Sequence, residues 1–279
     1  MMGNFVDDNM KTYTGINESW DILDKKIEEG TPFCYVRFNE GESRMVANIP
    51  GRLRRSTKLE KQKAKGNCTI TKYGPGHKRK FGRWSYNEQK DKDFLRMMRE
   101  SLLEEGDNYF ASCCDNTGYS NYRYQVLLLM EEGMKNLPKQ VLSAHMPHSK
   151  GVHWKMFDCF KKHQPKCQLI VNEKGNVDNL PFKFGNVWRV ANEEAHRKNM
   201  DLVDKISDTI EKEGIRNNLF LCCAGPFSNI LLHQIWKRQP NNFYLDIGST
   251  LDYYMFNSPT RGWLNKMGYP EKPRGKDLR

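Results

Sequence analysis

The chain has no run of apolar residues that approaches the roughly 18 needed for a helix to cross a bilayer. Residues 1–11 also lack the apolar core and the cleavage-site pattern of a secretory signal. The sequence therefore predicts a protein without a transmembrane segment, and we expect it to be soluble and cytoplasmic.

Cysteine is present, but it lacks the spacing that metal clusters use. The eight cysteines include no C-x-x-C pair, which disfavours a zinc cluster. Two pairs, Cys113–Cys114 and Cys222–Cys223, are adjacent in sequence, and without a secretory signal a disulfide framework is also disfavoured. We expect all eight cysteines to be reduced and structural.

Glycine-rich phosphate loops are missing as well, since neither a GxGxxG nor a Walker pattern occurs. The chain is nevertheless an ordinary candidate for a globular protein. At 279 residues, with 38% apolar and 28% charged residues, it is long enough to bury a core without disulfides.

Acidic residues are scarce between positions 52 and 83, where Glu60 stands alone against twelve lysines and arginines. The net charge of the whole chain is +11. The positive charge is therefore concentrated in this segment and not spread evenly along the chain. A solvated basic loop is the simplest interpretation of this segment. A cationic lid beside an anionic ligand and a nucleic-acid-binding surface are the alternatives, although no known nucleic-acid-binding motif is present.

Helical and strand patterns alternate along the chain. Periodicity predicts helices over 17–29, 88–105, 122–135, 153–162, 193–213 and 228–238. Apolar runs predict strands over 33–38, 109–113, 140–144, 167–172, 187–190, 218–224 and 243–247. This alternation predicts an α/β fold: a doubly wound, mostly parallel, Rossmann-like sheet with helices on both faces. We expect 1–279 to form a single domain with a basic insertion at about 50–85 and a flexible tail at about 266–279.

The strand expected at 33–38 leads into an acidic turn in which Glu40 and Glu42 flank a glycine. Two carboxylates at this spacing suit a hard divalent cation that bridges phosphate oxygens. Arg37 adds a fixed positive charge for a phosphate or for a carboxylate. A helix N-terminus, where acidic residues favour the dipole, explains the same spacing without a ligand.

The strand expected at 218–224 runs through a turn of small residues into a helix. Gly225 lets a ligand approach the backbone, Pro226 suits the first helical turn, and Ser228 or Asn229 can cap the helix. Free N–H groups at such a helix start form an anion site. A tight strand-to-helix turn without a ligand is the alternative.

The last expected strand carries Asp246 and is followed by Gly248 and Ser249 in a turn. Asp246 has three available roles, as a ligand-binding carboxylate, as a general base or as a structural cap. Asp-x-Gly also occurs in the first motif of S-adenosylmethionine-dependent methyltransferases. The second glycine of that motif is missing here, and only about thirty residues follow, too few for the downstream strands of that fold.

Together the three elements resemble the bacterial glycosyltransferases of the GT-D fold. Those proteins carry Arg-x-Gly-Asp-Gly-Glu near the first strand, a Gly-Pro turn before a late helix, and Asp-Ile-Gly with an acidic-aromatic stretch after it. The corresponding segments here are 37–42, 224–226, 245–249 and 252–254. Two positions differ: Asn39 replaces a glycine, and Glu40 replaces an aspartate and is one methylene longer.

The resemblance implies an enzyme, a hexosyl- or pentosyltransferase. It implies transfer of a sugar from a nucleoside-diphosphate sugar, most often a UDP-sugar, to a hydroxyl of a glycan, assisted by Mn²⁺ or Mg²⁺. The metal would be held by Glu40 and Glu42. The residues implied in donor binding are Arg37, Glu40, Glu42, Gly225, Pro226, Ser228, Gly248 and Ser249. The candidates for the general base are Asp246, Asp115 and His148.

Two other classes of protein compete with this interpretation. A nucleic-acid-binding protein would use the basic 52–83 segment and show salt-steep binding. A methyltransferase would bind S-adenosylmethionine without a metal. Only the glycosyltransferase interpretation uses motifs at both ends of the chain, so we do not expect nucleic acid as a partner.

Overall fold

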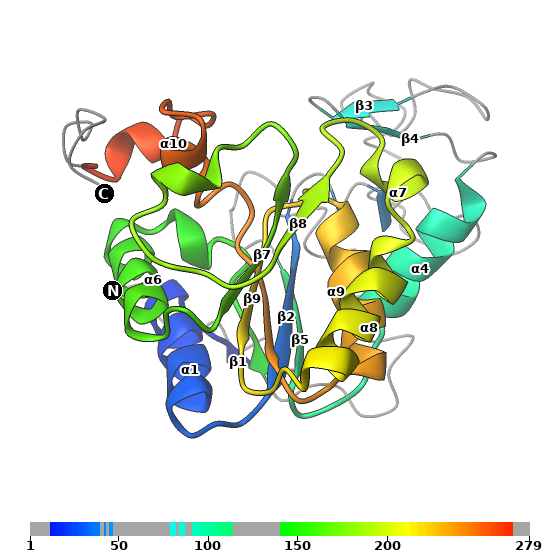
Figure 1. The fold of residues 1–279 in the computed structure, drawn as a ribbon, viewed down its shortest axis with the longest axis horizontal. Coiled ribbons are helices and arrows are strands. Elements are labelled where there is room, and N and C mark those ends of the chain that lie inside the picture. The colour runs from blue at the N-terminus through cyan, green and yellow to red at the C-terminus, as the bar shows by residue number, and fades with distance from the viewer. Residues whose placement is uncertain are drawn as a thin grey trace.

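A six-stranded sheet forms the centre of the protein, and every neighbouring pair of its strands is parallel (Figure 1). The computed structural model describes residues 12–39, 42, 45–46, 79–81, 84–86, 91–113 and 140–269. The strand order is β5-β2-β10-β9-β7-β8. The strands are β2 (Phe33–Phe38), β5 (Tyr109–Cys113), β7 (Cys167–Asn172), β8 (Val187–Val190), β9 (Leu219–Cys222) and β10 (Phe243–Asp246).

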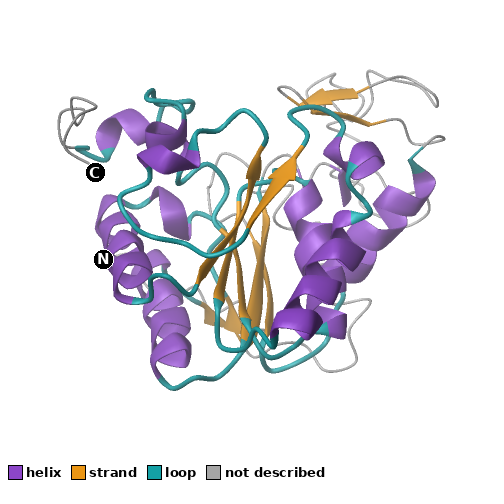
Figure 2. Cartoon of the chain, viewed as in Figure 1, coloured by secondary structure: helices purple, strands orange, loops and turns teal. Residues whose placement is uncertain are grey.

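Helices cover both faces of the sheet, as Figure 2 shows. One face carries α1 (Ile16–Glu28), α6 (Lys150–Lys162) and α10 (Asp252–Met255). The other carries α4 (Lys92–Leu102), α7 (Ala195–Lys198), α8 (Leu202–Glu213) and α9 (Phe227–Arg238). The predicted α/β class, with a doubly wound parallel sheet, is confirmed.

Each face of the sheet buries its own hydrophobic core. Side chains alternate along β2 because successive residues of a strand point to opposite faces. Cys34, Val36 and Phe38 belong to the core under α4, α8 and α9, whereas Phe33 and Tyr35 belong to the core under α1 and α6. A strand that is buried on both faces reads as a continuous apolar run, which is the pattern that predicted it.

The first and last strands of the sheet lie side by side at its centre. Leu245 of β10 pairs with Tyr35 of β2, and Asp246 of β10 pairs with Cys222 of β9. Segments separated by about two hundred positions in the chain therefore end at one edge. This topology determines which motifs meet.

Most predicted elements occur within about five residues of their expected bounds, but the helix predicted over 193–213 is not continuous. It is broken into α7 and α8, with Glu194 in the left-handed region at φ 56°. The Asn199 side chain accepts a hydrogen bond of 2.8 Å from the Ala191 amide. Asparagine competes for backbone N–H groups in this way and disfavours a helix interior.

Shorter elements lie outside the main sheet. The strand predicted at 140–144 is reduced to β6 (Gln140–Val141), which pairs with β1 (Thr12–Tyr13), while Ser143 forms one bridge to Cys113. At the end of the basic segment, β3 (Arg79–Phe81) and β4 (Trp84–Tyr86) form an antiparallel hairpin. Positions 52–78, the helix predicted at 122–135 and the tail from 270 lie outside the described residues.

Three 3₁₀ turns complete the described chain: η4 (Met146–His148), η5 (Val177–Asn179) and η6 (Leu264–Lys266). The six described cysteines are free thiols, as predicted. In the described part of the chain, no helix is both long and apolar enough to cross a membrane.

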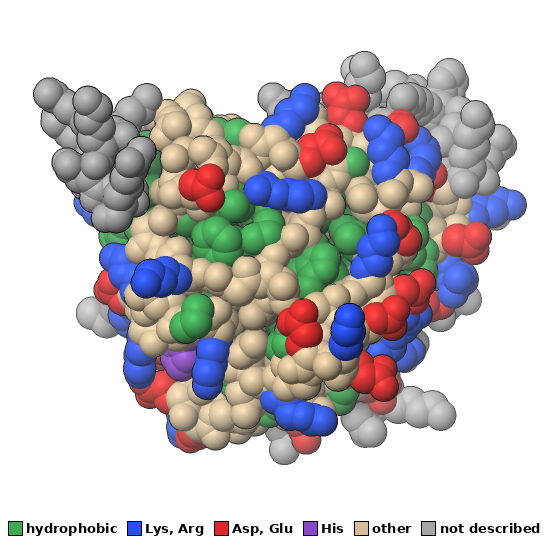
Figure 3. All heavy atoms as spheres, in the orientation of Figure 1, with side chains coloured by type: hydrophobic (Ala, Val, Ile, Leu, Met, Phe, Trp, Pro, Cys, Tyr) green, Lys and Arg blue, Asp and Glu red, His purple; other side chains and the backbone are tan. Residues whose placement is uncertain are grey.

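The face that carries the edge strand β8 mixes charges of both signs, as Figure 3 shows. Hydrophobic side chains are exposed between them, near the centre of this face. Trp188 of β8 is partly buried against the core. The described residues of this face therefore form no field of one sign of the kind that binds nucleic acid.

Candidate functional site

The carboxyl ends of β2, β9 and β10 form one edge of the sheet, because the three strands are parallel neighbours. Ligands of open α/β folds bind at this edge. The three motifs predicted from the sequence all reach it, one from each of these strands. The site is built from Arg37 on β2, Ser228 after β9, and Asp246 and Gly248 at the end of β10.

Arg37 is buried, with 3% of its surface exposed, and it is held by two separate segments, residues 144–148 and α9. Its Nε donates a hydrogen bond of 2.8 Å to the Ala144 carbonyl, and its Nη2 lies 3.2 Å from His148 Nε2. Its own carbonyl accepts 3.0 Å from the Asn229 amide of α9. A guanidinium fixed in this way supplies a permanent positive charge at a defined position.

Gly248 lies directly against the guanidinium of Arg37. It has φ +56°, and a Cβ placed on it would lie 2.1 Å from Arg37 Nη1. Its amide donates a hydrogen bond of 3.0 Å to Asp246. The close approach needs a residue without a side chain, which gives a physical reason for glycine at this turn.

Asp246 is a buried carboxyl beside this cation, with 5% of its surface exposed. Burial raises the pKa of Asp246 to about 6, while Arg37, the Gly248 and Arg37 amides and the Ser228 hydroxyl all act in the opposite direction. A carboxylate with a pKa close to neutral pH accepts a proton readily once a substrate is bound. Among the described residues predicted as a general base, Asp246 has the more suitable chemistry.

Glu42 is a second carboxyl near the same guanidinium. Burial raises the pKa of Glu42 to about 7, the charge of Asp246 raises it further, and Arg37 lowers it. The Asn39 amide donates to the Glu42 carboxylate, the backbone half of a capping box. The helix-start alternative therefore applies to Glu42, and its ligand-binding role stays a prediction. The charge of Arg37 thus acts on both Glu42 and Asp246. When both carboxyls are ionised, their two negative charges exceed the one positive charge of this guanidinium.

Oxygen atoms of the kind that hard divalent cations prefer occur among the residues of this edge. The Oδ1 atoms of Asn39 and Asn229 are buried and have no hydrogen-bond partner. With the carboxylates of Glu42 and Asp246 they supply the oxygen donors that Mg²⁺ and Mn²⁺ prefer. The described residues contain no group of three or more His, Cys, Asp or Glu side chains placed so that together they could hold a metal ion. Mg²⁺ does not need one, because one or two carboxylates and substrate phosphates suffice.

His148 is held as a neutral ring. It stacks on Trp263 with centroids 4.4 Å apart and on His145 at 5.3 Å. Burial and the adjacent Arg37 lower the pKa of His148 to about 2. Because Arg37 only donates, His148 Nε2 accepts this hydrogen bond. The structure thus favours a role for His148 in orienting Arg37 over its predicted role as the general base.

The turn between β9 and α9 contains the other predicted donor-binding residues. Gly225 is exposed and has φ +58°, and Pro226 is the N-cap of α9. Ser228 is fully buried and accepts a hydrogen bond of 3.1 Å from the Ala224 amide. Ser228 therefore closes the turn and touches Asp246, whereas Gly225 faces the solvent.

The structure brings Arg37, Glu42, His148, Ser228, Asp246 and Gly248 to one edge, with Ser249 half-buried beside them. Glu40 and Asp115 lie outside the described residues, so their predicted roles stay predictions.

Sequence reasoning missed Trp263, and it placed Asn229 only as a helix cap. Trp263 had no motif or periodic pattern around it. The sequence did contain a signal for Asn229, because a polar side chain in a mostly apolar, buried helix needs a hydrogen-bond partner.

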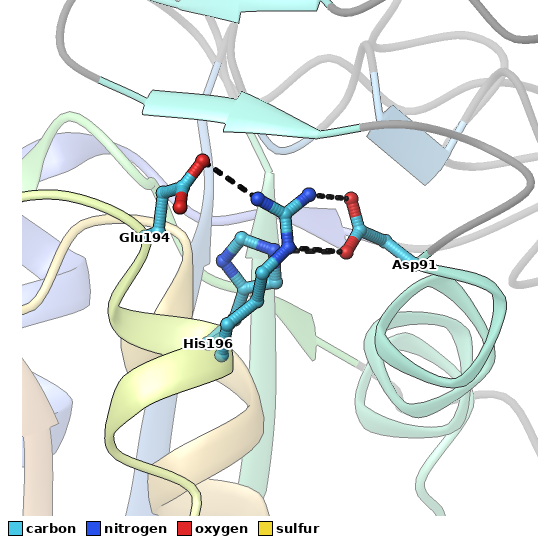
Figure 4. Close-up of polar contacts among 4 residues, drawn as sticks. Asp91, Glu194 and His196 are labelled. Atoms are coloured by element: carbon cyan, nitrogen blue, oxygen red, sulfur yellow. Dashed lines mark hydrogen bonds and ion pairs between the residues drawn. The ribbon is translucent and has the colours of Figure 1, made fainter.

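A second polar cluster joins α7 to the start of α4 (Figure 4). The Asp91 carboxylate is 4% exposed and accepts 2.9 Å and 2.6 Å hydrogen bonds from Arg197. His196 Nε2 lies 3.3 Å from the same carboxylate, and Glu194 binds the other side of the Arg197 guanidinium at 2.6 Å. This bidentate pair connects two helices on one face of the sheet.

Comparison with known proteins gives a likeness in structure only. No protein-family model and no curated protein matches the sequence. One similar structure is described as a highly conserved domain of unknown function with a distinct glycosyltransferase fold. It has a TM-score of 0.50 and 16% identity over 89% of this chain and 83% of that chain. Another is described as a new glycosyltransferase from Streptococcus sanguinis, with a TM-score of 0.50 and 16% identity over 90% of this chain and 86% of that chain. At this identity the likeness establishes a shared fold.

Proposed function

We propose that the protein is a glycosyltransferase, a hexosyl- or pentosyltransferase of the GT-D type. It would transfer a sugar from a nucleoside-diphosphate donor, with a UDP-sugar favoured, to a hydroxyl of a glycan. One observation carries the proposal: a buried, rigidly held Arg37 faces two carboxyls of raised pKa at the carboxyl edge of the sheet. The shared fold with structures described as glycosyltransferases supports it.

The donor diphosphate is assigned to Arg37 and the start of α9. Negative charge develops on the diphosphate as the bond to the sugar breaks, so fixed cations and N–H groups stabilise the transition state. The exposed Gly225 leaves the backbone at that turn open to a ligand, and the buried Pro226 is the N-cap of α9. Gly248 borders the guanidinium directly, and Ser249 is the next residue of the same turn.

Glu42 and the predicted Glu40 are the residues assigned to Mn²⁺ or Mg²⁺. When bound, the cation would add positive charge beside the departing diphosphate. The unpartnered Oδ1 atoms of Asn39 and Asn229 favour such a cation at this edge.

In the reaction the bond from the anomeric carbon to the phosphate oxygen breaks, and a bond from that carbon to the acceptor oxygen forms. The acceptor hydroxyl loses its proton to a general base, for which Asp246 is our first choice. Its buried carboxylate already accepts hydrogen bonds that hold it in place. Asp115 and His148 are the other predicted candidates.

Thermal-shift measurements with UDP, GDP and their sugar conjugates, with and without Mn²⁺, test the proposal. We expect a nucleotide to raise the melting temperature of the wild type and to have no effect on Glu42→Ala. Glu211→Ala, an exposed acid on α8, is the matched control and should respond like the wild type. A shift with S-adenosylmethionine or an oligonucleotide, and with no nucleotide sugar, would contradict the proposal.

A further inference from the structure

A cavity of about 410 Å³ lies between α10, the loop that follows it and the segment around η6. Its volume falls in the range of about 300–1,000 Å³ that is usual for small-molecule sites. The α10 helix is the first helix after β10 and lies beyond the carboxyl end of the sheet (Figure 1), so the cavity lies on that side of the molecule. Its main lining residues are Tyr253, Asn257, Ser258, Leu264, Asn265 and Tyr269.

Two stacked tyrosine rings line the cavity. The rings of Tyr253 and Tyr269 are parallel within 6°, with centroids 3.7 Å apart. The Tyr269 hydroxyl lies 2.7 Å from His153 Nε2, and Trp154 packs edge-on against the Tyr269 ring. Tyr269 is therefore held from behind, and it fixes the half-buried ring of Tyr253 as a rigid aromatic surface. We refer to Tyr253 and Tyr269 as the tyrosine platform.

The remaining polar lining is neutral. Asn257, Ser258 and Asn265 are exposed. Asn257 is kept in the left-handed region at φ 51°. Amide and hydroxyl groups bind the hydroxyls of a ligand, whereas a phosphate or carboxylate ligand calls for cations. Among the described residues, none of the side chains that line the cavity is charged, so a neutral ligand rich in hydroxyls fits this lining better than an anion.

The cavity is joined to the Arg37 site through Trp263. Trp263 is the residue before Leu264, which lines the cavity. The Trp263 ring stacks on the His148 ring with centroids 4.4 Å apart. His148 in turn accepts the hydrogen bond from Arg37 at 3.2 Å. A ligand in the cavity would thus lie on the same side of the sheet as the carboxyls proposed for the reaction.

We propose that the tyrosine platform and its neutral rim bind the saccharide that accepts the transferred sugar. The apolar C–H face of a pyranose ring would pack on Tyr253, and its hydroxyls would bond to Asn257, Ser258 and Asn265. One aromatic face of Tyr253 is occupied by Tyr269, and the ring of Tyr254 lies perpendicular to Tyr253 with centroids 5.6 Å apart. A sugar ring would therefore pack on the opposite face of Tyr253 from Tyr269. This assignment rests on the proposed glycosyltransferase function.

The test is saturation-transfer NMR on the full chain with lactose, maltose, cellobiose, N,N′-diacetylchitobiose and uridine. We expect at least one disaccharide to bind. Tyr253→Ala should weaken that binding at least about tenfold, because truncation of an aromatic anchor is costly. Tyr253→Phe keeps the ring and should stay within about threefold. Asn265→Ala should weaken binding, whereas the exposed Asn241→Ala control should not.

The result that overturns the inference is the absence of disaccharide binding, or binding that Tyr253→Ala leaves unchanged. Binding of uridine in place of the disaccharides would also overturn it, since the platform would then hold the nucleobase. The UDP thermal shift, measured on the same variants, separates the two proposals. A retained shift without saccharide binding rejects only the acceptor site. Saccharide binding without any nucleotide shift supports saccharide binding by the platform, but it rejects the transferase and with it the role of that saccharide as acceptor.

Discussion

The guanidinium of Arg37 occupies the space that a side chain at position 248 would fill. Gly248 has φ +56°, and a Cβ on it would lie 2.1 Å from Arg37 Nη1. The same glycine donates its amide to Asp246 at 3.0 Å. A single turn after β10 therefore sets the distance between the cation and the carboxyl on which the proposed chemistry depends.

Gly248→Ala is expected to displace Arg37 and to abolish the thermal shift with nucleotide. The control is Gly214→Ala, because Gly214 has a similar φ of +63° but no atom near the added Cβ. Backbone strain alone should cost the control about 1 kcal/mol of unfolding free energy. Urea unfolding should show a larger loss for Gly248→Ala. Equal losses in the two variants, with nucleotide binding retained, would mean that the contact with Arg37 has no function.

Arg37→Lys is expected to weaken nucleotide binding by about tenfold or more. A lysine ammonium cannot reproduce both the hydrogen bond to Ala144 and the contact with His148 in the planar geometry of arginine. Titration calorimetry with UDP measures the loss. Arg238→Lys, a change in the exposed pair with Asp204, should leave the affinity unchanged. An Arg37→Lys protein with wild-type affinity would show that charge alone is enough.

His148→Gln is expected to retain activity within about tenfold of the wild type, because glutamine still offers an acceptor to Arg37. His148→Phe keeps a ring for Trp263 to stack on but loses the acceptor, so it should lose more. Once a donor is known, activity is measured as kcat/KM, and its dependence on pH is compared between the wild type and the two variants. A loss of about a hundredfold or more in His148→Gln would instead identify His148 as the general base.

The sequence predicted the edge on which the site lies because that information is local. Phe33–Phe38 and Phe243–Asp246 are apolar runs that end in acidic and glycine residues, and parallel strands place such ends together. The helices α1 and α9 followed from their spacing and their terminal residues. These features needed no knowledge of distant contacts.

The contacts that hold Arg37 could not be predicted in this way. Ala144 contributes only a carbonyl oxygen, which any residue carries, and it lies 107 positions from Arg37. Trp263 meets His148 through a stacking contact that leaves no periodic trace in sequence. The break at Asn199 arose from one side-chain hydrogen bond to Ala191, which outweighed a helical pattern on both sides.

Arg197→Ala is expected to lower the unfolding free energy by about 3 kcal/mol, since it leaves the buried Asp91 carboxylate without its bidentate partner. Lys205→Ala removes an exposed ion pair with Asp201 and should cost less than about 1 kcal/mol. Adding Asp91→Asn to Arg197→Ala should recover part of the loss, because the buried negative charge is removed together with its bidentate partner. Strictly additive losses in chemical denaturation would show that the two side chains are not coupled.

The last prediction concerns stability at acid pH. His153 is fully buried among aromatic rings, and burial lowers the pKa of His153 to about 4. In the unfolded chain its pKa is about 6.5. Between these values the unfolded state binds the additional proton, so stability is lost as pH falls through this window. Above about pH 6.5 the stabilisation from the neutral ring is fully present.

Comparison of the wild type with His153→Gln isolates this effect, because the other groups titrate in both proteins and glutamine can still bond to the Tyr269 hydroxyl. The wild type should lose on the order of 2–3 kcal/mol relative to the variant between pH 7 and pH 4. Urea unfolding at a series of pH values measures the difference. A difference that stays constant over this range would mean that His153 can be protonated in the folded protein, and that the aromatic cluster behind the tyrosine platform admits water.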